Sequence, residues 1–250
     1  MHVIERPGTG TVALCLHGFC QSSLFWAPML DRLSGAGIAG IAPDLPGFGA
    51  SAGLPGPWTL EGYADGLAVL LDRRGLDRVA VVGGSMGGAV AQHFALRHPA
   101  RVARLLLVAT GAYTADPTAA LARADQLENE IWDDALTTPM VAGFFHQPPD
   151  AATLAAFRRV AGMANRTAAV SAARSNARAR TFERLGEIAV PTLIVQGRHD
   201  RSRTPEHGAE MAARIPGARL VVLEGSGHTP QIEEPEAFLA VAVPFLKDGG

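Results

Sequence analysis

Six short apolar runs recur along the chain, and each ends in turn-forming or polar residues. The runs are 12–16, 38–42, 79–82, 102–109, 192–195 and 220–223. Their apolar residues are continuous rather than alternating, which is typical of strands buried on both faces of a parallel sheet. Stretches with apolar residues at helical spacing lie between them, as in 60–74 and 86–96. This alternation predicts right-handed crossovers and a doubly wound parallel sheet.

Two segments depart from that rhythm. Residues 2–5 leave room for one further strand, and Gly8-Thr9-Gly10 predicts an antiparallel hairpin between it and the run at 12–16. The sheet is therefore expected to have about seven strands. Residues 111–187 contain helical patterns but no strand pattern. We expect this segment to form a helical cap or lid, and 1–110 together with 188–250 to form the α/β core.

Composition removes several classes of protein. The 250 residues carry a net charge of -2 and only 18% are charged, which excludes a highly charged disordered chain and a basic nucleic-acid-binding face. No apolar run approaches the roughly 18 residues of a membrane-spanning helix. The start, MHVIERPGTG, lacks the pattern of a secretory signal, so a cytoplasmic protein is expected.

The chain has few cysteines, and their spacing does not suggest a metal site. Cys15 and Cys20 are the two cysteines, and they fit neither a disulfide framework nor a zinc site. We expect neither a metal nor a cofactor. The predicted partner is a small-molecule substrate, and the sequence pattern fixes no oligomeric state.

The strongest chemical motif is the G-x-S-x-G sequence at 83–87, centred on Ser85. An apolar run precedes it and a helical pattern follows it, which is the strand–turn–helix setting of a nucleophile elbow. Glycines suit this turn because it is strained and packs against neighbouring backbone. Ser85 is thereby expected at the carboxyl ends of the strands, beside the N-terminus of a helix.

Five motifs then follow one another in a recognisable order. They are His17-Gly18-Phe19, residues 43–51, residues 83–87, Gly197-Arg198-His199-Asp200 and Gly227-His228. In this order the chain resembles the α/β-hydrolase superfamily over nearly its whole length. The run 84–93 looks most like carboxylesterases and enol-lactonases of aromatic catabolism. Serine at the elbow departs from epoxide hydrolases and haloalkane dehalogenases, which have aspartate there.

The resemblance implies a catalytic triad in the order serine, acid, histidine. A serine hydroxyl needs a base to remove its proton, and His228 follows the last apolar run. Asp200 follows the run at 192–195 and is expected to orient that histidine. Asp116, after the run at 102–109, is the alternative acid. His199 is interpreted as a loop residue.

The resemblance also implies an oxyanion hole. Its donors would be the backbone N–H groups of Phe19 and Met86, and each such donor is worth about 3 kcal/mol of barrier. Cys20 lies beside this loop and is a weak alternative nucleophile, because no residue at a fixed spacing would activate it.

Aromatic residues of the predicted cap, together with Trp26 beside the implied oxyanion hole, are candidates for the substrate pocket. They are Trp26, Trp132, Phe144, Phe145 and His146. Lys247 is the single lysine among 22 basic residues. This bias is interpreted mainly as genome composition, but a cap arginine or Arg198 is a hypothetical partner for a substrate carboxylate.

The sequence therefore predicts a serine hydrolase of a small, largely apolar ester or lactone. Hydrolysis of carbon–carbon bonds in vinylogous diketones is the main alternative, followed by thioesterase and perhydrolase activity. A slow or non-hydrolytic ligand-binding protein on the same fold is the alternative from outside the enzymes.

Overall fold

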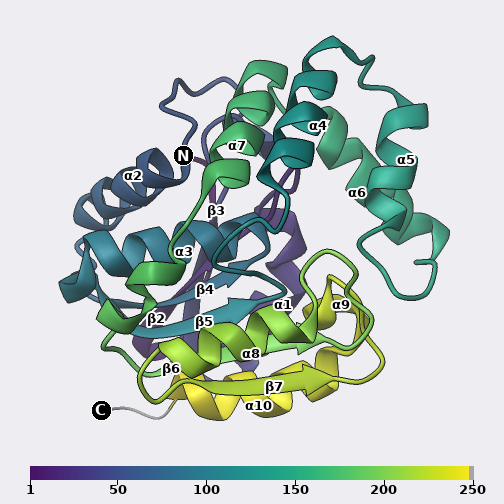
Figure 1. The fold of residues 1–250 in the computed structure, drawn as a ribbon. Coiled ribbons are helices and arrows are strands. Elements are labelled where there is room, and N and C mark those ends of the chain that lie inside the picture. The colour runs from purple at the N-terminus through teal and green to yellow at the C-terminus, as the bar shows by residue number, and fades with distance from the viewer. Residues whose placement is uncertain (248–250) are drawn as a thin grey trace.

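The computed structural model describes residues 1–247, and a seven-stranded sheet lies at its centre (Figure 1). The strands are β1 Val3–Arg6, β2 Thr9–Leu16, β3 Ile38–Pro43, β4 Val79–Gly84, β5 Val102–Val108, β6 Thr192–Gly197 and β7 Arg219–Leu223. Their order across the sheet is β1-β3-β2-β4-β5-β6-β7. All neighbours are parallel except β1 and β3. The predicted mostly parallel α/β fold is confirmed.

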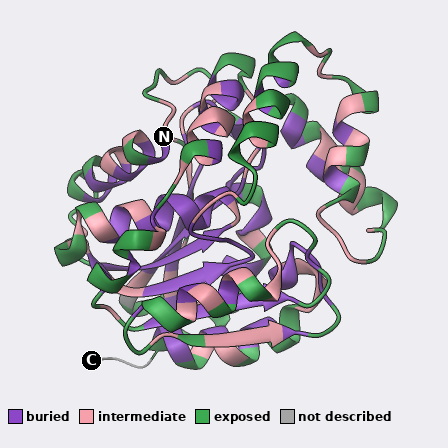
Figure 2. Cartoon of the chain, viewed as in Figure 1, coloured by how far each residue is buried: buried purple, intermediate pink, exposed green. Residues whose placement is uncertain are grey.

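Helices cover both faces of the sheet, and the central strands β4 and β6 are wholly buried, whereas the edge strands β1 and β7 are partly exposed (Figure 2). One face packs against α1 Ala27–Gly35 and α10 Pro235–Lys247, and the other against α2 Leu60–Arg73, α3 Met86–Arg97 and α8 Pro205–Arg214. Strand β4 contributes Val79 and Val81 to one core layer and Ala80 and Val82 to the other. Burial of both sets explains why its apolar run is continuous. The short helices are η1 Ser23–Phe25, η2 Gly49–Ser51, η3 Pro99–Arg101, η4 Phe182–Glu187 and α9 Pro230–Glu233.

The hairpin expected at the N-terminus does not form, and that prediction was wrong. Strand β1 pairs with β3, which separates it from β2. The connection crosses the start of β3 at Gly8, where any Cβ atom would overlap the backbone of Ala39. The glycine at this position therefore serves a close backbone crossing rather than a tight turn.

Four helices lie consecutively between β5 and β6. They are α4 Pro117–Asn129, α5 Asp134–Ala142, α6 Ala151–Gly162 and α7 Arg166–Arg178. Helices α4 and α7 pack side by side, and α5 packs on α6 (Figure 1). Each helix begins at an N-cap residue whose side chain accepts a hydrogen bond from a backbone amide of the first turn. These caps are Asp116, Asp133, Asp150 and Asn165 respectively.

Helix α5 was not expected from the sequence. It contains Pro139 and two adjacent threonines, which disfavour helix, and the Asp133 cap helps to fix its start. Within residues 1–247, no helix combines the length and apolar character needed to cross a bilayer. The last three residues of the predicted 188–250 core segment lie outside the described residues.

Candidate active site

Ser85 lies on a strained turn between β4 and α3, which we call the serine turn (residues 83–88). Its φ of 52° and ψ of -119° are rare for a residue with a side chain. A Cβ atom at Gly83 would overlap the carbonyl of Gly87, and one at Gly87 would overlap the carbonyl of Leu16. The glycines of the motif are thus required by close backbone packing, as the sequence pattern predicted.

The end of β5 and Thr110, two residues beyond it, hold the serine turn in place. The Ser85 amide donates to the Val108 carbonyl at 2.9 Å. The Thr110 hydroxyl donates to the Ser85 carbonyl at 2.8 Å. Both main-chain polar groups of Ser85 are thus hydrogen-bonded, which holds its unusual conformation.

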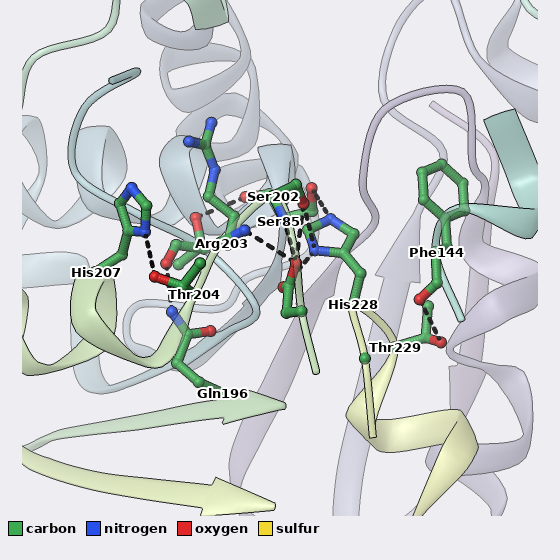
Figure 3. A network of polar contacts seen from close by, with 12 residues as sticks. Ser85, Phe144, Gln196, Ser202, Arg203, Thr204, His207, His228 and Thr229 are labelled. Atoms are coloured by element: carbon green, nitrogen blue, oxygen red, sulfur yellow. Dashed lines mark hydrogen bonds and ion pairs between the residues drawn. The ribbon is translucent and has the colours of Figure 1, made fainter. Parts of the chain in front are cut away.

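A continuous hydrogen-bond chain joins Ser85, His228 and Asp200 (Figure 3). Ser85 Oγ is 2.7 Å from His228 Nε2, and His228 Nδ1 is 2.6 Å from Asp200 Oδ2. The three residues follow β4, β7 and β6, so the parallel sheet gathers them at one edge. His228 and Asp200 are 8% and 4% exposed, whereas Ser85 is partly open to solvent.

The Asp200 carboxylate has partners on both oxygens. Its Oδ1 accepts the Ser202 amide at 2.8 Å and the Arg203 amide at 2.9 Å. Burial by itself raises the pKa of Asp200, but the hydrogen bond and charge of His228, with these two amides, outweigh burial and hold the pKa below its usual value. Asp200 is therefore ionised at neutral pH and can orient an imidazolium.

The segment carrying His228, residues 224–229, is here called the histidine loop, and Glu233 of α9 braces it. Glu233 Oε2 accepts the Gly227 amide at 2.9 Å and the Thr229 hydroxyl at 2.9 Å. Its Oε1 accepts the His146 amide at 2.6 Å. One carboxylate thus gathers groups on both sides of His228. Sequence reasoning missed Glu233, although its place five residues after the histidine in a short helix was a usable signal.

The loop after β2 lies against the serine turn. His17 donates from Nδ1 to the Gly18 carbonyl at 2.8 Å and accepts the Leu45 amide at Nε2 at 2.9 Å. That pattern fixes a neutral tautomer, and burial lowers the pKa of His17, which agrees with it. A Cβ atom at Gly18 would lie 3.3 Å from Ser85 Cβ, so the loop passes directly beside the serine.

The amides of Phe19 and Met86 flank this contact. Within residues 1–247, neither amide donates a hydrogen bond to another protein group. Both amides therefore stay unpaired within the described residues. Phe19 also lines a groove of about 740 Å³ with Leu127 of α4 and Met140 of α5.

The alternative catalytic residues have other places in the structure. Asp116 caps α4 by accepting the Ala119 amide at 2.9 Å. Cys20 is 2% exposed, and burial raises the pKa of its thiol, so it stays protonated. In the part of the chain that the structure describes, no group of histidine, cysteine and acidic residues is arranged to hold a metal ion.

Three of the five predicted pocket residues approach the triad from the loop after α5. The Phe144 ring is 5.8 Å from the His228 ring between centroids. Its carbonyl accepts the His228 amide at 2.9 Å. Phe145 packs on Phe157, and His146 stacks on His199 at 3.6 Å. This loop therefore places Phe144 beside the catalytic candidates.

The two tryptophans lie elsewhere. Trp26 is 2% exposed in the core layer beneath β4, and a Cβ atom at Gly84 would lie 3.3 Å from its ring. Trp132 lies in the connection between α4 and α5, and its ring nitrogen donates to the Leu127 carbonyl of α4 at 3.0 Å. Trp26 is thus a core residue behind the serine strand.

Ion pairs engage most of the arginines considered as carboxylate partners. Arg198 forms two hydrogen bonds, of 2.7 and 2.9 Å, with Glu224. Arg158, Arg174 and Arg180 likewise pair with neighbouring acids. Across residues 1–247, Arg159, Arg166 and Arg178 have no acidic partner within ion-pair distance. These three remain the free cations of the α4–α7 segment.

Comparison with known proteins agrees with this architecture. A hydrolase of Pseudomonas putida named 2-hydroxy-6-oxononadienedioate/2-hydroxy-6-oxononatrienedioate hydrolase 2 is 32% identical, over 96% of this chain and 88% of that protein. The crystal structure of an enol-lactonase from Burkholderia xenovorans superposes with a TM-score of 0.92 at 28% identity, covering 99% of this chain and 96% of that one. A thermophilic esterase from Thermogutta terrifontis gives a TM-score of 0.89 at 28% identity, covering 98% and 92%.

The match to a family extends over most of the chain. Residues 12–235 fit the family described as the alpha/beta hydrolase fold. That range includes the serine turn, Asp200 and the histidine loop. The chain therefore belongs to the α/β hydrolase fold family.

Proposed function

We propose that this protein is a serine hydrolase that cleaves a small carboxylic ester or lactone through Ser85, His228 and Asp200. The hydrogen-bond chain that joins these three side chains, at 2.7 and 2.6 Å, carries the proposal. A nucleophile, a base and an orienting acid in direct contact are what acyl transfer by serine requires.

The geometry supports a two-step reaction. His228 Nε2 takes the Ser85 proton as Oγ attacks the substrate carbonyl. The Phe19 and Met86 amides then donate to the oxyanion of the tetrahedral intermediate. His228 returns the proton to the leaving alcohol, and an acyl-serine remains. A water molecule, deprotonated by His228, cleaves the acyl-serine and releases the carboxylic acid and free Ser85.

A second candidate is hydrolysis of a carbon–carbon bond in a vinylogous diketone. Curated relatives at 30–32% identity bear names of this activity, such as 2-hydroxy-6-oxo-6-phenylhexa-2,4-dienoate hydrolase from Burkholderia cepacia. The enol-lactonase and esterase structures favour the ester reaction. The two reactions differ in the atom that receives the proton, carbon or oxygen, and the same three residues can serve both.

The decisive variant is Ser85→Ala, with Ser34→Ala as a matched control. Ser34 lies on the exposed side of α1 and donates to the Pro7 carbonyl. With p-nitrophenyl butyrate, we expect kcat to fall by about 10⁴-fold or more for Ser85→Ala and to be unchanged for Ser34→Ala. A fluorophosphonate probe should label the wild type and Ser34→Ala but not Ser85→Ala. Equal turnover by all three proteins would contradict the proposed triad.

Paired substrates separate the two reactions. Turnover of an enol-lactone at least 100-fold faster than turnover of a 2-hydroxy-6-oxo-dienoate would support the ester assignment, and the reverse ratio would support carbon–carbon cleavage. A few turnovers per hour on either, with tight binding, would instead indicate a ligand-binding protein on this fold.

A further inference from the structure

A second apolar cavity, of about 420 Å³, lies between α1, α6, α9 and the first residue of α10. Its walls include Phe25, Met29, Phe157, Val160 and Ile232. The volume falls within the range of small-molecule sites. None of the three triad residues lines it.

Aromatic rings stand between this cavity and the triad. Phe25 and Phe157 of its wall contact each other, with ring centroids 3.6 Å apart. The Phe144 ring centroid is 6.5 Å from that of Phe157 and 5.8 Å from that of His228. A molecule in the cavity would therefore contact a different set of residues from a substrate at Ser85.

Two arginines from different helices also line the cavity. The Arg32 guanidinium is bound to both carboxylate oxygens of Glu236, at 2.7 Å each, so its charge is matched. Arg159 of α6 is exposed, and no acid within residues 1–247 pairs with it. Gln231, 8% exposed, adds a polar group to the wall, and its Oε1 has no hydrogen-bond partner among the described residues. The cavity thus combines an apolar interior with one unmatched positive charge.

We propose that this cavity binds an amphipathic carboxylate, such as an aryl-substituted alkanoate, separately from the reaction at Ser85. Its apolar body packs on Phe25, Phe157 and Ile232, which removes apolar surface from water. Its carboxylate pairs with Arg159, because a guanidinium can donate two parallel hydrogen bonds to the two oxygens of a carboxylate. The site does not depend on the proposed hydrolase activity, since it uses none of the catalytic groups.

The test measures binding of 4-phenylbutyrate by calorimetry, with 4-phenylbutanol as the uncharged match. For a ligand of this size we expect a Kd of about 0.1–1 mM for the acid. Arg159→Gln should weaken binding of the acid about tenfold and leave the alcohol unchanged. Arg166→Gln, which removes another unpaired arginine outside the cavity, should change neither.

A cavity-filling variant locates the ligand. Ala156 lines the cavity, whereas Ala155 on the same helix does not. Ala156→Trp should abolish binding of both probes, and Ala155→Trp should preserve it, with circular dichroism confirming the fold of each variant. Retained binding in Ala156→Trp would place the ligand elsewhere, and no binding of the acid to the wild type at about 10 mM would also overturn the proposal. Neither result bears on labelling at Ser85, so failure here is distinct from failure of the proposed triad.

Discussion

The serine turn and the histidine loop supply two halves of one hydrogen-bond chain, but they are built differently. Main-chain packing fixes the serine turn: glycines at 83 and 87 allow backbone to touch backbone, and the Ser85 amide bonds to β5. Side chains and a distant segment fix the histidine loop. Glu233 binds the Gly227 amide from one side, and the carbonyl of Phe144 accepts the His228 amide from another.

This difference determines how each region responds to substitution. A turn held by backbone contacts tolerates almost no added side chain at its glycines. A substitution at one of them displaces several packed backbone groups at once. A loop held by side-chain carboxylates can lose one of them and keep its fold, with His228 less well placed. We therefore expect substitutions in the two regions to differ in kind as well as in size.

The largest effect should come from Gly87→Ala. The added Cβ atom would overlap the carbonyls of Leu16 and His17, so backbone at the edge of the sheet must move. We expect the melting temperature to fall by about 3–10 °C. The value of kcat should drop about 100-fold or more, because the serine turn and the loop after β2 would move together. Thermal melts and ester turnover measure the two effects.

Gly35→Ala is the matched control for that substitution. Gly35 is the last residue of α1 and a Cβ atom there meets no atom within 4 Å. It should leave turnover unchanged and stability equal or slightly higher, because alanine favours helix over glycine. If Gly87→Ala behaved in the same way, close backbone packing would not be what fixes the serine turn.

Local patterns explain what could be predicted from the sequence. The strand runs were recognised because burial on both faces makes them continuous, and the serine turn because its glycines are close in sequence. Asp200 and His228 were placed through the order of motifs, and the structure joins them by a hydrogen bond.

Contacts between distant segments explain what could not be predicted. The pairing of β1 with β3 depends on a backbone crossing at Gly8 that no local pattern encodes. Helix α5 forms despite Pro139 because Asp133 caps it and its Val141 packs among Phe25 and Phe157. Trp26 was predicted to line the pocket because it follows the loop after β2, but it packs in the core layer against the sheet.

The intermediate effect should come from Glu233→Gln. The amide keeps one acceptor oxygen but loses the charge that gathers Gly227, Thr229 and His146. We expect kcat to fall about tenfold with little change in KM, since His228 loses its support while the substrate site stays intact. The kcat of Glu233→Ala, which has no acceptor oxygen at this position, should be lower still.

Glu234→Gln is the matched control for the brace. Glu234 accepts a single amide, from Gly225 at 2.9 Å, at the far end of the same loop. Turnover should stay within about twofold of wild type. Similar losses in Glu233→Gln and Glu234→Gln, or a rise in KM without loss of kcat, would show that Glu233 supports the fold rather than the position of His228.

The smallest effect should be a difference in how the melting temperatures of variants at the acid of the histidine loop and at the serine turn depend on pH. The pKa of Asp200 is held below its usual value in the folded protein, so its ionised form adds stability above the pKa of the unfolded chain. That stability is lost as the pH falls through the folded pKa. The gap in melting temperature between wild type and Asp200→Asn should therefore be about 2–4 °C near neutral pH and should shrink as the pH falls below the ordinary aspartate pKa of 3.8. The serine turn contains no titratable side chain, so the gap between wild type and Ser85→Ala should stay constant over the same range. Parallel pH dependence of the two gaps would mean that the histidine loop is not held through the Asp200 carboxylate.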